Sequence, residues 1–120
     1  MAIHITGPKQ IPACGHPPKI IHEYIGRVNS KTSAVSVAQM DSPAGWSELE
    51  KTPAFGEYTV VLEGTLRVTT RDDAFDVGPG QAVIAGKGEW IQYITPHEGG
   101  AKYVAICLPA FSPEAVHRDA

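Results

Sequence analysis

The sequence has no long apolar run, few cysteines and no excess of basic residues, and each of these absences excludes a class of protein. No hydrophobic stretch among the 120 residues approaches the roughly 18 that a membrane-spanning helix needs. Two cysteines, Cys14 and Cys107, do not make a disulfide framework. Residues 1–5 lack the basic and hydrophobic parts of a secretory signal. We therefore expect a cytoplasmic protein that does not enter a membrane.

The charge balance also argues against one kind of partner. Ten Lys and Arg residues stand against 13 Asp and Glu residues, which gives a formal net charge of -3. A protein that binds nucleic acid or an anionic membrane surface usually carries a basic excess. We therefore expect no nucleic-acid or membrane partner.

A chain of this length with 42% hydrophobic residues should form one core.

Turn residues divide the chain into short β-branched and aromatic segments. Twelve Gly and ten Pro residues separate segments that recur at a spacing of about 8–12 residues, which is typical of an antiparallel sandwich or barrel. A two-strand hairpin across Glu63 and Gly64 is expected, because glycine tolerates the positive φ of hairpin turns. The expected strands cover residues 19–28, 34–40, 58–62, 66–70, 75–77, 82–85, 90–94 and 102–108.

The two ends of the chain are predicted to differ from the barrel. Residues 1–18 are rich in Pro and Gly and are expected to form an extended arm. Residues 19–111 are expected to form the barrel, and residues 112–120 a tail with one short helix that begins at Ser112 and Pro113. Sheet edges and the Ile-rich first strand predict a homodimer with two-fold symmetry.

Two groups of residues resemble the motifs of the cupin superfamily. Glu57 and Gly64, with six residues between them, are similar to the end of the first cupin motif, and Gly45 lies near its opening. Gly80 and Gly88 are similar to glycines of the second motif. This resemblance, to small single-domain cupins of the cupin 2 type, covers residues 45–109 and implies an all-β fold, an antiparallel jelly-roll barrel.

The resemblance also implies where the metal-binding histidines of a cupin would stand, and none of these positions holds His. The His-x-His pair falls on Glu50, Lys51 and Thr52, and the His of the second motif falls on Ile91. A first-row divalent metal needs three or four N or O ligands. Glu50 and Glu57 without imidazole would bind such a metal only weakly, so we expect no cofactor and no three-histidine metal site.

Strand alternation predicts a polar pair inside the barrel. Glu57 and Tyr93 lie on the strand faces that the cupin register turns inward. They are our candidate catalytic residues, with Glu57 as acid or base. The alternative for Glu57 is a structural carboxylate. The ligand-binding candidates are aromatic residues near the expected rim together with the residues at the altered motif positions: Trp46, Glu50, Thr52, Glu57, Trp90 and Ile91.

Three basic residues can be interpreted either as solvated surface charges or as ligand contacts. Lys19, Arg27 and Lys51 are expected to be exposed and solvated, with contact to a ligand carboxylate as the alternative.

Three functions are consistent with this sequence. The first is a cupin barrel that binds a small organic ligand without the usual metal site. The second is an enzyme of the lyase, isomerase or cyclase type that uses Glu57 as acid or base, or as ligand of a weakly held divalent metal. The third is a structural dimer without a small ligand.

Overall fold

The computed structural model describes residues 2–13, 15–48 and 50–116, which form ten strands and one short helix. The last four residues of the expected tail, 117–120, lie outside these ranges. In chain order the elements are β1 (Lys9–Ile11), β2 (Ile20–Ile25), β3 (Ser36–Ser42), β4 (Trp46–Ser47), β5 (Gly56–Gly64), β6 (Leu66–Thr70), β7 (Ala74–Val77), β8 (Ala82–Ala85), β9 (Ile91–Thr95), β10 (Ala101–Leu108) and α1 (Pro113–Val116).

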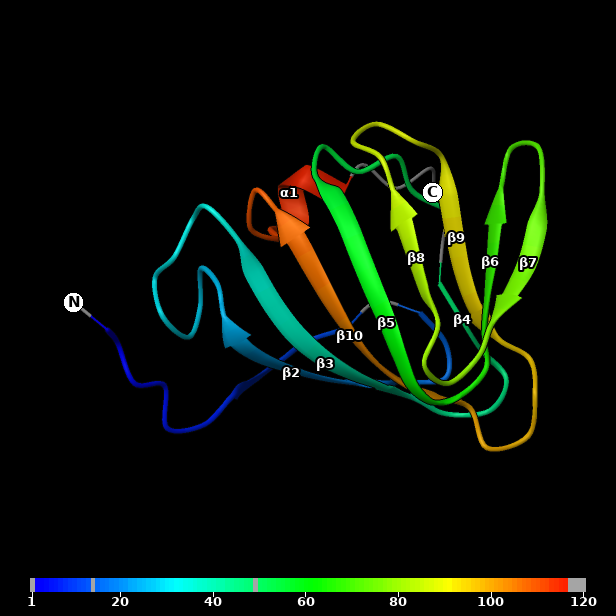
Figure 1. Ribbon diagram of the computed structural model, residues 1–120, viewed down its shortest axis with the longest axis horizontal. Helices are drawn as coiled ribbons and strands as arrows, with labels where there is room; N and C mark the ends of the chain where they lie inside the picture. The colour runs from blue at the N-terminus through cyan, green and yellow to red at the C-terminus, as the bar shows by residue number, and fades with distance from the viewer. Residues whose placement is uncertain (1, 14, 49, 117–120) are drawn as a thin grey trace.

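Two antiparallel sheets face each other and make a jelly-roll barrel (Figure 1). The larger sheet has the order β1-β2-β3-β10-β5-β8, and the smaller has the order β4-β9-β6-β7. The all-β, antiparallel prediction is therefore confirmed. No helix in the described ranges is long and apolar enough to cross a membrane.

The predicted β5–β6 hairpin is wrong. β5 pairs with β10 and β8, whereas β6 pairs with β7 and β9 in the other sheet. Gly64 turns the chain from one sheet to the other with φ of 75°. At this corner Thr65 donates a backbone hydrogen bond to Gly100 (3.2 Å), so the turn packs against β10 rather than closing a ladder. Gly64 does mark a turn, as predicted, but this turn connects a strand of one sheet to a strand of the other sheet.

Two short strands lie where the sequence predicted none. β1 lies inside the expected arm and pairs with β2, and β4 lies in the expected loop and pairs with β9. The boundaries of the other strands differ from the predicted ones by a few residues at most, and α1 begins at the predicted Pro113.

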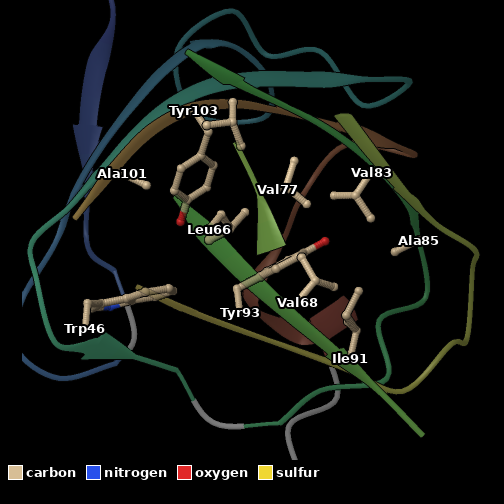
Figure 2. Packing of buried hydrophobic residues seen from close by; sticks show 11 residues of the cluster. Trp46, Leu66, Val68, Val77, Val83, Ala85, Ile91, Tyr93, Ala101 and Tyr103 are labelled. Atoms are coloured by element: carbon tan, nitrogen blue, oxygen red, sulfur yellow. The ribbon is translucent and has the colours of Figure 1, made fainter. Parts of the chain in front are cut away.

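Alternation along the strands separates the barrel interior from the surface. β10 buries every second residue, from Ala101 to Cys107, and β5 buries Glu57, Thr59 and Val61. Figure 2 shows the resulting apolar cluster pointing into the barrel. A second, smaller cluster of Phe55, Cys107 and Val116, with Phe111 and Ala115 packed against it, joins α1 to one end of the barrel. The cluster in Figure 2 consists of Trp46, Val61, Leu66, Val68, Val77, Val83, Ala85, Ile91, Tyr93, Ala101 and Tyr103.

Substitution of Gly64 tests the corner between the sheets. A Cβ at Gly64 would collide with the carbonyl oxygen of Gly100 and lie 2.9 Å from Ala101 Cα. We expect Gly64→Ala to lower the free energy of unfolding by about 2–4 kcal/mol, from overpacking and from the positive φ. Gly80 is the matched control, since its φ is 78° and a Cβ there has no neighbour within 4 Å among the described residues. Gly80→Ala should cost only about 1–2 kcal/mol in chemical denaturation. Equal losses would show that the corner is not tightly packed.

Candidate functional site

A cavity of about 940 Å³ lies against the inner face of the larger sheet. β1, β2, β3, β10 and β5 contribute to its wall, and Tyr93 enters it from β9 of the smaller sheet. The space exists because small side chains meet across the sheet. Ala38 of β3 is the register partner of Ala105 of β10, which in turn is the partner of Thr59 of β5. Both alanines line the cavity, and their methyl groups occupy little of the space in front of the sheet.

Three buried charged side chains meet at the wall of this cavity. Lys51 Nζ lies 3.3 Å from Glu48 Oε1 and 3.3 Å from Glu57 Oε1. The side chains of Lys51, Glu48 and Glu57 are only 7%, 3% and 7% exposed. Among the described residues Glu57 Oε1 has no hydrogen-bond partner, so its contact with Lys51 is an ion pair without hydrogen-bond geometry. The Lys51 ammonium also lies 4.7 Å from the centre of the Tyr93 ring, within the range of a cation–π contact.

Backbone contacts hold this charged cluster in place. Lys51 exchanges two backbone hydrogen bonds with Ile91, of 3.1 and 2.9 Å. Tyr93 donates its backbone N–H to Glu48 Oε1 at 3.3 Å, and Gln92 donates its side-chain amide to the Glu48 carbonyl at 2.9 Å. Glu48 and Lys51 are thereby fixed to the start of β9, while Glu57 is held by β5 in the other sheet. The cluster joins the two sheets across the barrel.

Two neutral acids stand beside Glu57. Cys107 is the register partner of Glu57, and its Sγ lies 3.9 Å from Glu57 Oε2, close enough for a weak S–H donor contact. Burial, and then the charge of Glu57, raises the pKa of the Cys107 thiol to about 12. The same two causes raise the pKa of Tyr93 well above its usual value. The Tyr93 hydroxyl has no hydrogen-bond partner among the described residues. At neutral pH both groups therefore keep their protons.

A second cation lies at another part of the cavity wall. Lys19 Nζ stands 4.0 Å from the centre of the Trp46 ring and donates a hydrogen bond of 3.3 Å to the Tyr103 hydroxyl. Ser42 Oγ lies 2.9 Å from the same hydroxyl. Burial raises the pKa of Tyr103 far above its usual value, so it too stays neutral.

The chain is similar to one curated relative and to many solved structures. No protein-family model matches it. It is 33% identical over 101 residues to endoribonuclease YbeY of Myxococcus xanthus, a match that covers 84% of this chain and 34% of the relative. The chain thus spans about a third of the length of that relative.

The solved structures share the fold at low sequence identity. The polyketide cyclase RemF of Streptomyces resistomycificus is 17% identical with a TM-score of 0.77, over 100% of this chain and 85% of the cyclase. Oxalate decarboxylase of Bacillus subtilis is 17% identical with a TM-score of 0.77, over 98% and 31% of the two chains. A predicted oxalate decarboxylase of Thermotoga maritima is 16% identical with a TM-score of 0.72, over 91% and 99%.

These solved neighbours are cupin-fold proteins. The chain has the cupin fold. The barrel therefore agrees with the resemblance that the glycine and glutamate spacing indicated, while the low identities carry no statement about ligand or reaction.

The structure brings some of the predicted site residues together and leaves others apart. Glu57 and Tyr93 both line the cavity. Glu50, Thr52 and Trp90 do not line it, and each is only partly buried. Trp90 lies outside the cavity wall, with Arg71 Cζ 5.4 Å from its ring centre.

Trp46 and Ile91 are interior residues rather than rim residues. Trp46 is fully buried and Ile91 is 1% exposed, and both belong to the apolar cluster of Figure 2. They shape the barrel interior without lining the cavity.

The sequence missed Glu48 and misjudged Lys51. Lys51 was expected to be exposed, but it is 5% exposed and faces the cavity. Lys19 and Arg27 also line the cavity. The one available signal was the position of Lys51 in the middle of the altered His-x-His pair. Glu48 and Lys51 lie outside the named strands, so strand alternation could not tell whether their side chains point inward.

The residues at the cavity do not fit the metal that the cupin fold implies. None of the described histidines, His4, His16, His22 and His97, lines the cavity. In the described part of the chain, no group of three or more His, Cys, Asp or Glu residues is arranged to hold a metal ion. Only two carboxylates meet here, and an ammonium lies between them.

The raised pKa values predict a loss of stability in alkali. Cys107, Tyr93 and Tyr103 keep their protons in the folded state at pH values where the unfolded chain loses them. Above about pH 9 the free energy of unfolding therefore falls as the pH rises, by at most about 1.4 kcal/mol per pH unit for each group. We expect the free energy of unfolding in urea to fall steadily from pH 9 to pH 11.

Tyr93→Phe isolates one of these groups. Because the Tyr93 hydroxyl lacks a hydrogen-bond partner among the described residues, its removal should change stability at pH 7 by less than about 1 kcal/mol. The fall above pH 10 should become shallower than in the wild type. A wild-type slope in Tyr93→Phe would contradict the assigned shift.

Proposed function

We propose that this protein is a small-molecule-binding cupin of the cupin 2 type, whose barrel takes a small organic ligand without a three-histidine metal site. The observation that supports this function best is the cavity of about 940 Å³, which is within the range of ligand pockets. Its wall is largely apolar, with Ile21, Ala38, Met40 and Ala105 on the sheet face, and its polar groups converge near Glu57.

The charges at the wall favour a neutral ligand. Four carboxylates (Glu23, Glu48, Glu57 and Glu114) and three cations (Lys19, Arg27 and Lys51) line the cavity. The charge of Lys51 is already balanced by two carboxylates at 3.3 Å. An acidic ligand would meet this negative excess in a region of low dielectric, where like charges repel strongly. A mostly apolar molecule with a neutral oxygen or nitrogen that contacts the Tyr93 hydroxyl fits better.

An enzyme of the lyase, isomerase or cyclase type is the second candidate. Glu57 presents a carboxylate 3.3 Å from the Lys51 ammonium, and Tyr93 keeps its proton at neutral pH, so the two residues offer a ligand one acceptor and one hydrogen-bond donor. Among the fold neighbours, RemF is a polyketide cyclase and another is an oxalate decarboxylase. The cyclase supports this candidate more than the decarboxylase does, because oxalate is a small dianion and the carboxylates here would repel it.

An endoribonuclease activity is not part of the proposal. The shared segment covers 34% of the endoribonuclease YbeY of Myxococcus xanthus, so that activity need not belong to the shared part. RNA binding depends on cations that neutralise phosphates. The cavity wall instead has more carboxylates than cations.

Filling the cavity tests the proposed binding. N-phenyl-1-naphthylamine, a neutral apolar fluorophore, should bind saturably and with one site per chain. Ala105→Phe places a ring in the cavity and should weaken this binding at least about tenfold, because the probe and the ring compete for the same space. Ala82→Phe, at an exposed position on β8, should bind like the wild type.

The identity of the natural ligand decides between the two candidates. Organic extraction of the purified protein followed by mass spectrometry should yield a neutral molecule that Ala105→Phe lacks. Conversion of that molecule by the wild type would favour the enzyme. Equal probe binding by Ala105→Phe and Ala82→Phe, with both variants folded by circular dichroism, would refute the binding site.

We also propose a homodimer that forms through the outer face of the larger sheet. Apolar side chains that alternate with the buried ones are exposed there, and Tyr58 and Ile84 are register partners on β5 and β8. Closed two-fold pairing of one surface with itself is the commonest way to cover such a face. The exposed set on β5, β8 and β10 is Tyr58, Val60, Leu62, Ile84 and Leu108.

Sedimentation velocity at micromolar concentration tests the dimer. The wild type should sediment as a species of twice the 12.8 kDa chain mass, and Val60→Lys should shift it to the monomer because two ammonium groups would meet at the interface. Phe75→Lys, at an exposed position of β7 in the other sheet, should stay dimeric. A monomeric wild type would rule out the dimer.

A cytoplasmic location stays a prediction.

A further inference from the structure

We infer that the Lys51 ammonium serves as the built-in cation of this barrel, in the role that a divalent metal has in the cupins with histidine ligands. The inference deepens the proposed function, since it concerns the same cavity and rests on the proposed absence of the three-histidine site. It makes the binding site independent of metal ions and assigns the positive charge beside the ligand to this chain itself.

The geometry around Lys51 is the first argument. Its Nζ is equidistant, at 3.3 Å, from carboxylate oxygens of Glu48 and Glu57, and all three side chains are more than nine-tenths buried. Two buried carboxylates repel each other unless a cation lies between them, and a buried ammonium needs carboxylates for the same reason. Each partner thus requires the others.

The positions of Glu57, Lys51 and Ile91 relative to the cupin motifs are the second argument. Glu57 is the glutamate of the motif that resembles the cupin pattern, and Lys51 is the central residue of the segment that replaces the His-x-His pair. Ile91, which stands in place of the third His, is packed in the apolar cluster and offers no ligand atom. The glutamate has remained while the imidazoles have been replaced by one ammonium.

Competition between Lys51 and a divalent ion for Glu48 and Glu57 is the third argument. A divalent ion that binds between Glu48 and Glu57 must displace a cation that is tethered to the same chain. A tethered group acts at a high effective concentration. The displaced ammonium would also lose both carboxylates in a buried place. The wild type should therefore bind divalent metals weakly at this site.

An ammonium would hold a ligand differently from a metal ion. An ammonium gives a fixed positive charge and N–H donors, but it has no open coordination position for two ligand atoms at once. A neutral ligand near Lys51 would be held by hydrogen bonds rather than by chelation.

Manganese binding to Lys51→Met tests the inference. Methionine keeps the length of the side chain and removes its charge. The wild type, purified without a chelating tag, should show no change in melting temperature with 1 mM Mn²⁺ or with EDTA. Lys51→Met should melt at least about 10 °C lower, because two buried carboxylates lose their cation. Mn²⁺ should raise its melting temperature again by several degrees and bind with one site per chain in calorimetry.

Two further variants make the outcome decisive. Lys102→Met breaks the exposed Lys102–Glu63 pair of 3.8 Å, and it should behave like the wild type in both measurements. Lys51→Met combined with Glu57→Gln should melt higher than Lys51→Met alone and should not respond to Mn²⁺, since the second change removes the repulsion and a metal ligand. This comparison applies even if Lys51→Met folds only poorly.

Three results would overturn the inference. The first is stoichiometric Mn²⁺ binding by the wild type that Glu57→Gln abolishes. The second is a folded Lys51→Met variant that does not respond to Mn²⁺. The third is a double variant that melts lower than Lys51→Met. These measurements use no organic ligand, so failure of the fluorophore to bind would count against the proposed function and leave the role of Lys51 standing.

Discussion

Burying the Lys51 ammonium constrains the rest of this barrel. The ion needs carboxylates on two sides, and the chain supplies Glu48, directly after β4 of the smaller sheet, and Glu57 from β5 of the larger one, so the two sheets must approach at the right distance. The backbone bonds between Lys51 and Ile91 and the bond from Tyr93 N–H to Glu48 keep this distance. If one member of such a cluster were displaced, a buried charge would lose its partner, which is costly in a medium of low dielectric. The cluster therefore fixes both the packing of the sheets and the polar end of the cavity.

The cavity and the core divide the barrel interior between them. Large side chains such as Trp46, Leu66 and Val68 fill the part near the smaller sheet, where the apolar cluster is continuous. On the larger sheet the row Ala38, Ala105 and Thr59 crosses three neighbouring strands and offers little volume. A protein interior is normally packed without voids, so a row of small residues beside buried charges is unfavourable for stability alone. The proposed ligand would occupy this space.

Local patterns were sufficient to predict all the described strands except β1 and β4, but not how the strands are arranged. Alternation placed Glu57 and Tyr93 on inward faces correctly, because burial of one strand face fixes every second residue. The same reasoning failed at Gly64, since a turn that tolerates positive φ is compatible with a hairpin and with a crossing between sheets. Only the contacts of β6 with β9 and of Thr65 with Gly100, which are distant in the sequence, decide this. Alternation also could not identify Glu48 and Lys51 as inward residues, because both lie outside the named strands.

The position of Glu57 inside the barrel has a physical explanation in this arrangement. A carboxylate at this place on β5 faces Cys107, whose thiol keeps its proton, and Tyr93, whose hydroxyl does the same, so neither neighbour supplies positive charge. Left alone, Glu57 would be an uncompensated buried charge. A metal ion or an ammonium can compensate it, and both need a second carboxylate or further ligands nearby. In this barrel the Lys51 ammonium is the compensating cation for Glu57, and Glu48 is its second carboxylate partner.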